Sequence, residues 1–103
     1  MIARLTSFSG DPDGLREGAR IYEEQILPWL RDATGFRGVM VLHDEGERAL
    51  GLTFWETEAD ANAADEAMSR FRADVSGAVG STPLGAETYA VLLSVGPSLT
   101  LES

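Results

Sequence analysis

The chain has 103 residues, the size of one domain, and aliphatic and aromatic residues make up 44% of it, which is enough for a hydrophobic core. Its formal net charge is −9 and all eight basic residues are arginines, so in the absence of a basic cluster we expect it to bind neither nucleic acid nor an anionic membrane. The sequence has no cysteine, which excludes a disulfide framework, a thiolate nucleophile and a cysteine-ligated metal.

The sequence contains no segment typical of a membrane or secreted protein. Its first ten residues lack the charged and apolar regions of a signal peptide, and no apolar run approaches the roughly 18 residues needed to span a bilayer. We therefore expect a soluble cytoplasmic protein.

The first predicted element is a short strand over residues 2–9. It ends at S-G-D-P-D-G, a cluster of turn and cap residues. Asp11 or Asp13 can cap a helix that follows, with Pro12 in its first turn.

A helix from Leu15 onwards is predicted by apolar residues that recur every three or four positions. Pro28 lies inside this pattern, so we expect a kink or a helix in two pieces. Gly35 is placed to end the helix as a C-cap glycine. The apolar stripe consists of Leu15, Ala19, Tyr22, Ile26, Trp29 or Leu30, and Ala33.

Residues 36–43 and 48–56 are predicted as two strands of a hairpin. The turn D-E-G-E joins them, and Gly46 in that turn can take a positive φ. Both strands are apolar on both faces, whereas a sheet with one solvated face would alternate, so both faces need a cover. In the first strand the predicted faces are Phe36, Met40 and Leu42 on one side and Val39 and Val41 on the other.

The second half contains a second helix over residues 58–79 and a last strand over residues 88–95, T-Y-A-V-L-L-S-V, again apolar on both faces. Residues 96–103 form a tail that is either loose or a short edge strand. The helix stripe is Ala61, Ala64, Met68, Phe71, Val75 and Ala78 or Val79. The predicted flexible connection between helix and strand contains Gly77, Gly80, Pro83 and Gly85.

The predicted order β-α-β-β-α-β defines an α+β, ferredoxin-like fold, with a four-stranded antiparallel sheet and both helices on one face. A single domain over residues 1–103 accounts for all of these elements. The chain has no further element to cover the second apolar face of the sheet. We therefore expect a homodimer in which two sheets pack face to face.

The run A-T-G-F-R-G-V-M-V-L-H-D-E-G-E-R-A-L-G-L-T-F-W-E-T-E-A-D-A resembles the antibiotic-biosynthesis monooxygenase-like family of the dimeric α+β barrel superfamily. The shared marks are the G-F that closes the first helix, the hairpin, and W-E-T-E at the end of its second strand. The resemblance implies a face-to-face dimer with a pocket between sheet and helices in each subunit.

The resemblance also implies site positions. Quinone-forming members oxygenate a polyphenol without a cofactor, using a strand Asn, a strand-end Trp, a helix Tyr and an Arg. In this sequence the Trp is Trp55, the Asn position is Gly51 and the Tyr position is Ala61. The Arg corresponds to Arg72, or less well to Arg70. The haem-degrading members use a helix Trp, a helix His and a first-strand Asn, which are missing here, so we do not expect haem degradation.

Four residues are the candidates for a ligand site. Trp55 either fills the core where the sheet meets the second helix or forms an aromatic pocket wall. Arg72 lies at the border of the helix stripe, where an arginine either covers apolar surface with its stem or orients an anionic or phenolate ligand. Tyr22 and Trp29 lie on the first helix stripe and are either core residues or pocket walls.

Two functions follow as hypotheses. The first is cofactor-independent oxygenation of an aromatic or polyketide-like small molecule, with Trp55 and Tyr22 as walls and Arg72 stabilising developing negative charge. The second is a non-catalytic ligand-binding or structural dimer of the same fold. The lone His43 provides no metal cluster, so we expect no metal. The resemblance implies that no cofactor is needed.

Overall fold

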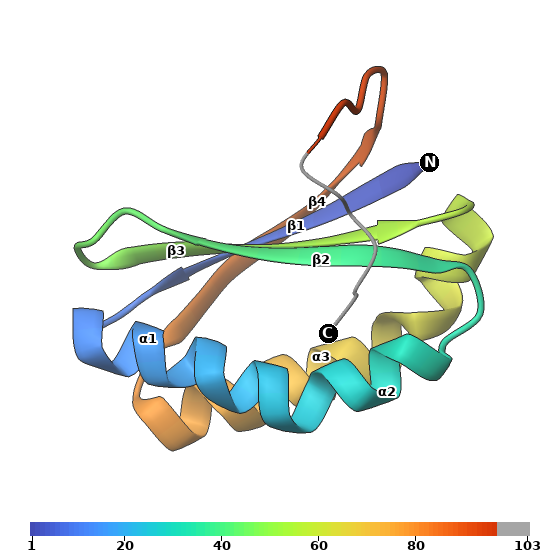
Figure 1. The fold of residues 1–103 in the computed structure, drawn as a ribbon. Coiled ribbons are helices and arrows are strands. Elements are labelled where there is room, and N and C mark those ends of the chain that lie inside the picture. The colour runs from blue at the N-terminus through green and yellow to red at the C-terminus, as the bar shows by residue number, and fades with distance from the viewer. Residues whose placement is uncertain (97–103) are drawn as a thin grey trace.

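The computed structural model describes residues 1–96 as one four-stranded antiparallel sheet with all helices on one face (Figure 1). The strands lie in the order β2-β3-β1-β4, so the predicted α+β, ferredoxin-like fold is confirmed. The prediction for the tail over residues 96–103 falls, apart from Gly96, outside the described residues. The elements are β1 (Ile2–Ser9), α1 (Pro12–Ile21), η1 (Tyr22–Ile26), α2 (Leu27–Asp32), β2 (Phe36–His43), β3 (Arg48–Trp55), α3 (Glu58–Val79) and β4 (Thr82–Ala90).

The first helical segment begins as predicted, with the Asp11 side chain accepting from the backbone N–H groups of Asp13 and Gly14. The break expected at Pro28 takes the form of a π-helical turn, η1, in which the Leu27 N–H donates to the Tyr22 carbonyl. The segments α1, η1 and α2 therefore continue as one rod beneath the sheet (Figure 1).

The π turn decides which of two apolar residues enters the core. In an uninterrupted helix of 3.6 residues per turn, Trp29 would lie almost in line with Leu15. The π turn contains one extra residue, so Leu30 takes that position instead. Leu30 is fully buried, while Trp29 is 37% exposed.

The end of this rod differs from the prediction. The helix ends at Asp32, and its C-cap, Ala33, is extended. Gly35 adopts the positive φ expected of it, 79°, but it does so two residues later, in the connection to β2. The Gly35 carbonyl there accepts a hydrogen bond of 2.7 Å from the Glu56 backbone N–H.

The β2–β3 hairpin has the predicted strands, except that β3 ends at Trp55 and β2 is bulged. The bulge lies between Phe36 and Gly38, and it puts Phe36 on the helix side, opposite Trp55, rather than on the face of Met40. At the turn, Glu45 rather than Gly46 has the positive φ. The carboxylate of Asp44 accepts from the Gly46 and Arg48 backbone N–H groups and so fixes the turn.

Helix α3 matches the predicted range. Thr57 caps its start by accepting from the Asp60 N–H, and Gly80, with a φ of 73°, ends it. The predicted flexible connection is much shorter, because Gly77 belongs to α3 and Pro83 belongs to β4.

The last strand was predicted too late in the chain. Strand β4 covers Thr82–Ala90 and all nine of its residues are exposed, so neither of its faces is buried. Strand β4 ends where its neighbour β1 begins. Ala90 pairs with Ile2, and the Val91 N–H donates the last hydrogen bond between the two segments to the Met1 carbonyl. Beyond it, Leu92, Leu93 and Val95 are 95%, 82% and 79% exposed.

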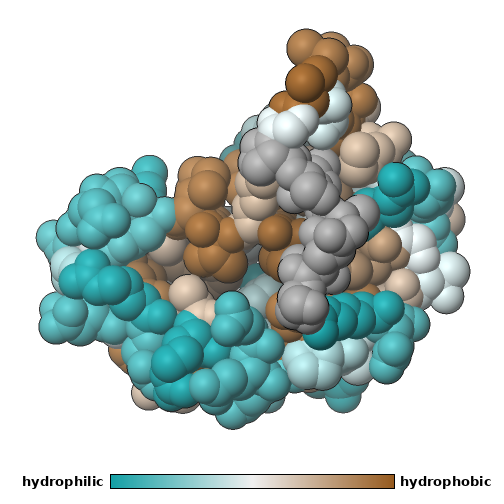
Figure 2. Space-filling view, viewed as in Figure 1, coloured by the Kyte–Doolittle hydropathy of each residue, from teal (hydrophilic) through white to brown (hydrophobic). Residues whose placement is uncertain are grey.

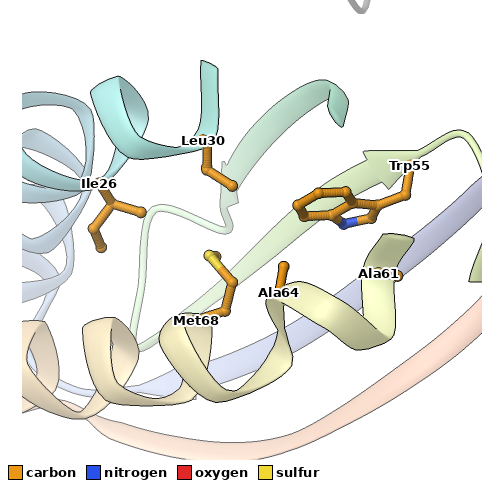
Figure 3. Packing of buried hydrophobic residues seen from close by; sticks show 6 residues of the cluster. All are labelled: Ile26, Leu30, Trp55, Ala61, Ala64 and Met68. Carbon is orange, nitrogen blue, oxygen red and sulfur yellow. The ribbon is translucent and has the colours of Figure 1, made fainter. Parts of the chain in front are cut away.

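The core lies between the sheet and the helical layer. Figure 3 shows Trp55 reaching from β3 into the space between α2 and α3. The cluster consists of Ile26, Leu30, Trp55, Ala61, Ala64 and Met68. Its small alanines on α3 leave room for the large indole ring, so helix and sheet approach closely at this end.

Candidate functional site

The candidate site consists of two neighbouring cavities between the sheet and the helices, and Arg72 lines both. The first cavity is apolar and small, with a volume of about 50 Å³. It lies between α1, η1 and α3 on one side and the hairpin end of the sheet on the other. Its walls are Phe8, Leu15, Gly18, Ala19, Tyr22, Val41, Ala49, Gly51, Arg72, Val75, Ser76, Val79 and Ser81.

Tyr22 provides the phenol of the apolar cavity and is the first residue of the π turn. Burial raises its pKa above the ordinary value, and the nearby Arg72 guanidinium opposes part of that rise. Tyr22 is therefore a neutral hydroxyl at physiological pH, suited to donating or accepting a hydrogen bond rather than to acting as a base.

Arg72 lies on α3 between the two cavities. Desolvation by burial lowers its pKa, while the neighbouring Tyr22 and Asp65 oppose that change. Its Nη2 donates to the Ser69 hydroxyl at 3.3 Å. An arginine stays charged in proteins, so Arg72 supplies a fixed, partly desolvated positive charge at the edge of an apolar cavity.

The second cavity is polar and larger, about 190 Å³. Arg4, on the helix-facing side of β1, contacts the Asp65 carboxylate and the Asn62 side chain on α3. The Arg4 Nε is buried and has no hydrogen-bond partner among the described residues. The lining residues are Arg4, Thr6, Thr53, Trp55, Ala61, Asp65, Met68, Ser69, Arg72 and Ala86.

Trp55 is above all a core residue. Its side chain is 1% exposed, packs edge-to-face against Phe36, and donates from Nε1 to the Thr53 hydroxyl at 2.9 Å. It also borders the polar cavity, where it forms an apolar wall. Its indole N–H is already satisfied by Thr53, so it is not free to bind a ligand.

The four predicted ligand residues are only partly brought together. Tyr22 and Arg72 share the apolar cavity, and Arg72 and Trp55 share the polar one. Trp29 lies apart from both, packed edge-to-face on Phe71 at a ring distance of 5.3 Å, beside a separate open groove. Their role in ligand binding stays a prediction.

Sequence reasoning missed the polar cavity, although one signal was present. In a strand, residues two apart share a face, so Arg4, Thr6 and Phe8 of β1 lie on the same side. That side faces the helices, where a charged residue needs a partner. Arg4 finds Asp65 there, but the pairing of strand with helix α3 is not visible in the sequence.

Two positions that the family resemblance singled out line the cavities without a polar side chain. Gly51 lines the apolar cavity, and a Cβ at this position would lie 3.6 Å from the Phe8 ring. Ala61 lines the polar cavity. Both positions enlarge the available space rather than add a reactive group.

Other types of site find no support in residues 1–96. No group of three His, Cys, Asp or Glu side chains there is arranged to hold a metal ion. The ring Nε2 of His43 instead contacts the Gly46 carbonyl oxygen at 2.9 Å in the hairpin turn. Within the same residues no helix is both long and apolar enough to cross a membrane.

Several solved structures of other proteins are similar to this structure. The monooxygenase from ActVA-Orf6 of Streptomyces coelicolor, solved with nanaomycin D, superimposes with a TM-score of 0.73 at 17% identity over 94% of this chain and 92% of that one. SnoaB, a cofactor-independent oxygenase from Streptomyces nogalater, gives 0.63 at 14% identity over 93% and 97%. A dimeric ferredoxin-like protein from an uncultured marine organism gives 0.62 at 9% identity over 93% and 98%.

No protein-family model and no curated protein sequence matches the chain. The structural similarities show that it has the ferredoxin-like fold of these solved structures. At these identities the similarity concerns the fold, and the function has to be argued from the site.

Proposed function

We propose that this protein binds a small polycyclic phenol between its sheet and its helices and oxygenates it without a cofactor. The observation that carries the proposal is the pairing of Tyr22 and Arg72 across an apolar cavity. The superposition on a monooxygenase and on a cofactor-independent oxygenase supports the same class of reaction.

The chemistry follows from the charge of Arg72. A desolvated guanidinium beside a bound phenol favours its anionic form, and the anion is electron-rich enough to react with molecular oxygen directly. When O₂ oxidises the phenol to a quinone, one ring C–H and the phenol O–H become two C=O groups; one oxygen atom of O₂ enters the ring carbonyl and the other is released as water. The substrate then supplies all four electrons, so the reaction needs no external reductant.

The size of the apolar cavity sets a condition on this proposal. Ligand pockets usually enclose roughly 300 Å³ or more, whereas this one encloses about 50 Å³. A polycyclic ligand therefore needs the space of both cavities. Arg72 separates them, and its long side chain is the element that has to move when the ligand enters.

A non-catalytic ligand-binding or structural dimer is the second candidate. It is favoured by Gly51 and Ala61, which bring no polar group to the site, and by the Trp55 N–H, which is bound to Thr53. In a ligand-binding dimer, Arg72 orients a ligand that is released without chemical change. In a structural dimer, the cavities bind no ligand.

The test is a titration of tryptophan fluorescence with polycyclic phenols and quinones, followed by oxygen uptake. We expect saturable quenching and oxygen consumption by the wild type, and a loss of at least about tenfold in both affinity and rate for Arg72→Gln. Arg70→Gln, the same change on the exposed side of α3, is the matched control. Binding without oxygen uptake would select the second candidate, and no binding would reject both ligand functions.

We also propose that the protein is a homodimer through the face of the sheet opposite the helices. Leu42 of β2 and Tyr89 of β4 are 48% and 50% exposed on that face. Figure 2 shows apolar surface on the uncovered side of the sheet and over the segment beyond β4. Large apolar side chains exposed on both edge strands of one sheet face favour burial by a partner, and a second copy is the natural cover. The similarity to a dimeric ferredoxin-like protein supports a dimer as the oligomeric state.

A further inference from the structure

The polar cavity holds an imbalance of charge that the proposed oxygenation does not use. Among residues 1–96, Arg4 and Arg72 both line it, and Asp65 is the one carboxylate in its wall. Asn62, which also contacts Arg4, is neutral. The lining therefore carries a net charge of about +1, inside a chain whose formal net charge is −9.

The Arg4 side chain is 16% exposed, and its Nε–H is buried without a partner among residues 1–96. An unsatisfied buried donor of this kind destabilises the folded state, so such groups in proteins usually have a partner. Asp65 and Asn62 contact the two terminal nitrogens of Arg4 and leave Nε unbound.

Arg4 also acts on Arg72. The positive charge of Arg4 contributes to lowering the pKa of Arg72, after the larger effect of burial and against the opposing effects of Tyr22 and Asp65. An anion placed in this cavity would interact favourably with both guanidinium groups.

Hydroxyl groups complete the lining. Thr6 and Thr53 are buried residues of β1 and β3 on the helix side. The Thr53 oxygen already accepts from the Trp55 N–H, so its own proton is available to donate to a ligand. The Ser69 oxygen likewise accepts from Arg72.

We propose that this polar cavity is a subsite for a carboxylate, and that the ligand is an aromatic acid whose ring lies in the apolar cavity beyond Arg72. The placement of the ring rests on the proposed function, whereas the carboxylate site does not. The volume of about 190 Å³ accommodates a carboxylate with a short arm. A single net positive charge matches a monoanion such as a carboxylate better than a phosphate dianion.

The first experiment observes Arg4 directly, by nuclear magnetic resonance of the arginine Nε–H groups during titration with sodium acetate. We expect the Arg4 signal to shift saturably, at a concentration at least about tenfold lower than any shift of Arg16, an exposed arginine paired with Asp13. Inorganic phosphate serves as the comparison. An Arg4 signal that moves no earlier than that of Arg16, or that responds more strongly to phosphate, overturns the carboxylate site.

The second experiment compares 2-naphthol with 6-hydroxy-2-naphthoate by tryptophan fluorescence. The wild type is expected to bind the naphthoate at least about tenfold more tightly, because the carboxylate gains charge-assisted hydrogen bonds. The paired variant Arg4→Gln/Asp65→Asn removes the Arg4 hydrogen-bond donors without leaving the partner charge unpaired, and should lose that preference. Arg16→Gln/Asp13→Asn is the matched control on a surface ion pair.

The outcomes separate the two proposals. Binding of 2-naphthol with no preference for the naphthoate, or a preference that survives in the paired variant, overturns the carboxylate subsite and leaves the proposed function standing. An Arg4 response to acetate with no binding of 2-naphthol supports the subsite and rejects the proposed aromatic site. The acetate titration uses the wild type, so it tests the carboxylate subsite even if the paired variant fails to fold.

Discussion

Tyr22 and Arg72 come from different helical segments, line the same apolar cavity, and each changes the pKa of the other. Burial raises the pKa of Tyr22, and the Arg72 guanidinium counteracts part of that rise. Burial lowers the pKa of Arg72, and Tyr22 counteracts part of that fall. The pair therefore combines a neutral phenol with a permanent cation on a largely apolar wall.

The first prediction concerns stability at high pH. The pKa of Tyr22 in the folded protein lies above its ordinary value of 10.0, so on raising the pH the unfolded chain loses this proton first. Stability due to this group is fully present below pH 10 and decreases above it. We expect the free energy of unfolding, measured in urea, to fall more between about pH 9 and about pH 11 for the wild type than for Tyr22→Phe. Equal losses would contradict the burial of the phenol.

The second prediction concerns the core role of Trp55. Trp55→Phe leaves a cavity and removes the hydrogen bond to Thr53, so it should lower the free energy of unfolding by about 1–3 kcal/mol. Trp29→Phe is the matched control, because Trp29 is 37% exposed, and should cost less than about 1 kcal/mol. Urea unfolding followed by circular dichroism measures both. Similar losses at the two positions would show that Trp55 is not the better packed residue.

The third prediction concerns Gly35. Its φ is 79°, and a Cβ at this position would overlap the Asp60 carboxylate. Gly35→Ala should therefore destabilise the protein by at least about 1–2 kcal/mol. Gly77 lies exposed in α3 with free space around it, so Gly77→Ala should be neutral or stabilise by up to about 1 kcal/mol. Melting temperatures of the two variants provide the comparison, and a harmless Gly35→Ala would contradict the close approach to Asp60.

The fourth prediction concerns the open face of the sheet. An aspartate carboxylate at position 42 would be buried without a partner charge in the proposed dimer interface. Leu42→Asp should therefore convert the dimer to a monomer. Ala73→Asp, on the exposed side of α3, should leave the dimer intact. Size-exclusion chromatography with light scattering measures the mass of both. A wild type that is monomeric at all concentrations would refute the homodimer.

Much of the fold was predictable because the periodic signals were long and agreed with one another. The apolar stripe of α3 predicted one helix over residues 58–79, which is the range that the structure shows. The β2–β3 hairpin has apolar runs of matched length around a turn sequence. These are local patterns, and local patterns are what a sequence displays directly.

The errors occurred where a distant partner decides the structure. β4 ends at Ala90 because β1 begins at Ile2, although the apolar pattern continues to Val95. Whether Trp29 or Leu30 is buried in the core depends on the π turn, which no sequence pattern predicts. The same holds for the candidate site. The helical periodicity identified Tyr22 and Arg72 as candidates, whereas Arg4 is a candidate only because β1 packs against α3 in the structure.

Strand β4 gives the polar cavity an outer wall of an unusual kind. It contributes Ala86 to the lining, yet none of its nine residues is buried, and its pairing with β1 is interrupted by a register shift near Ser7. An edge strand held mainly by backbone hydrogen bonds separates from its sheet far more readily than a strand anchored by core side chains. The cavity thus has a built-in route of entry, because brief fraying of β4 would admit a ligand while the helical layer and the hairpin stay folded. A bound ligand would in turn slow the exchange of the β4 amide hydrogens with solvent.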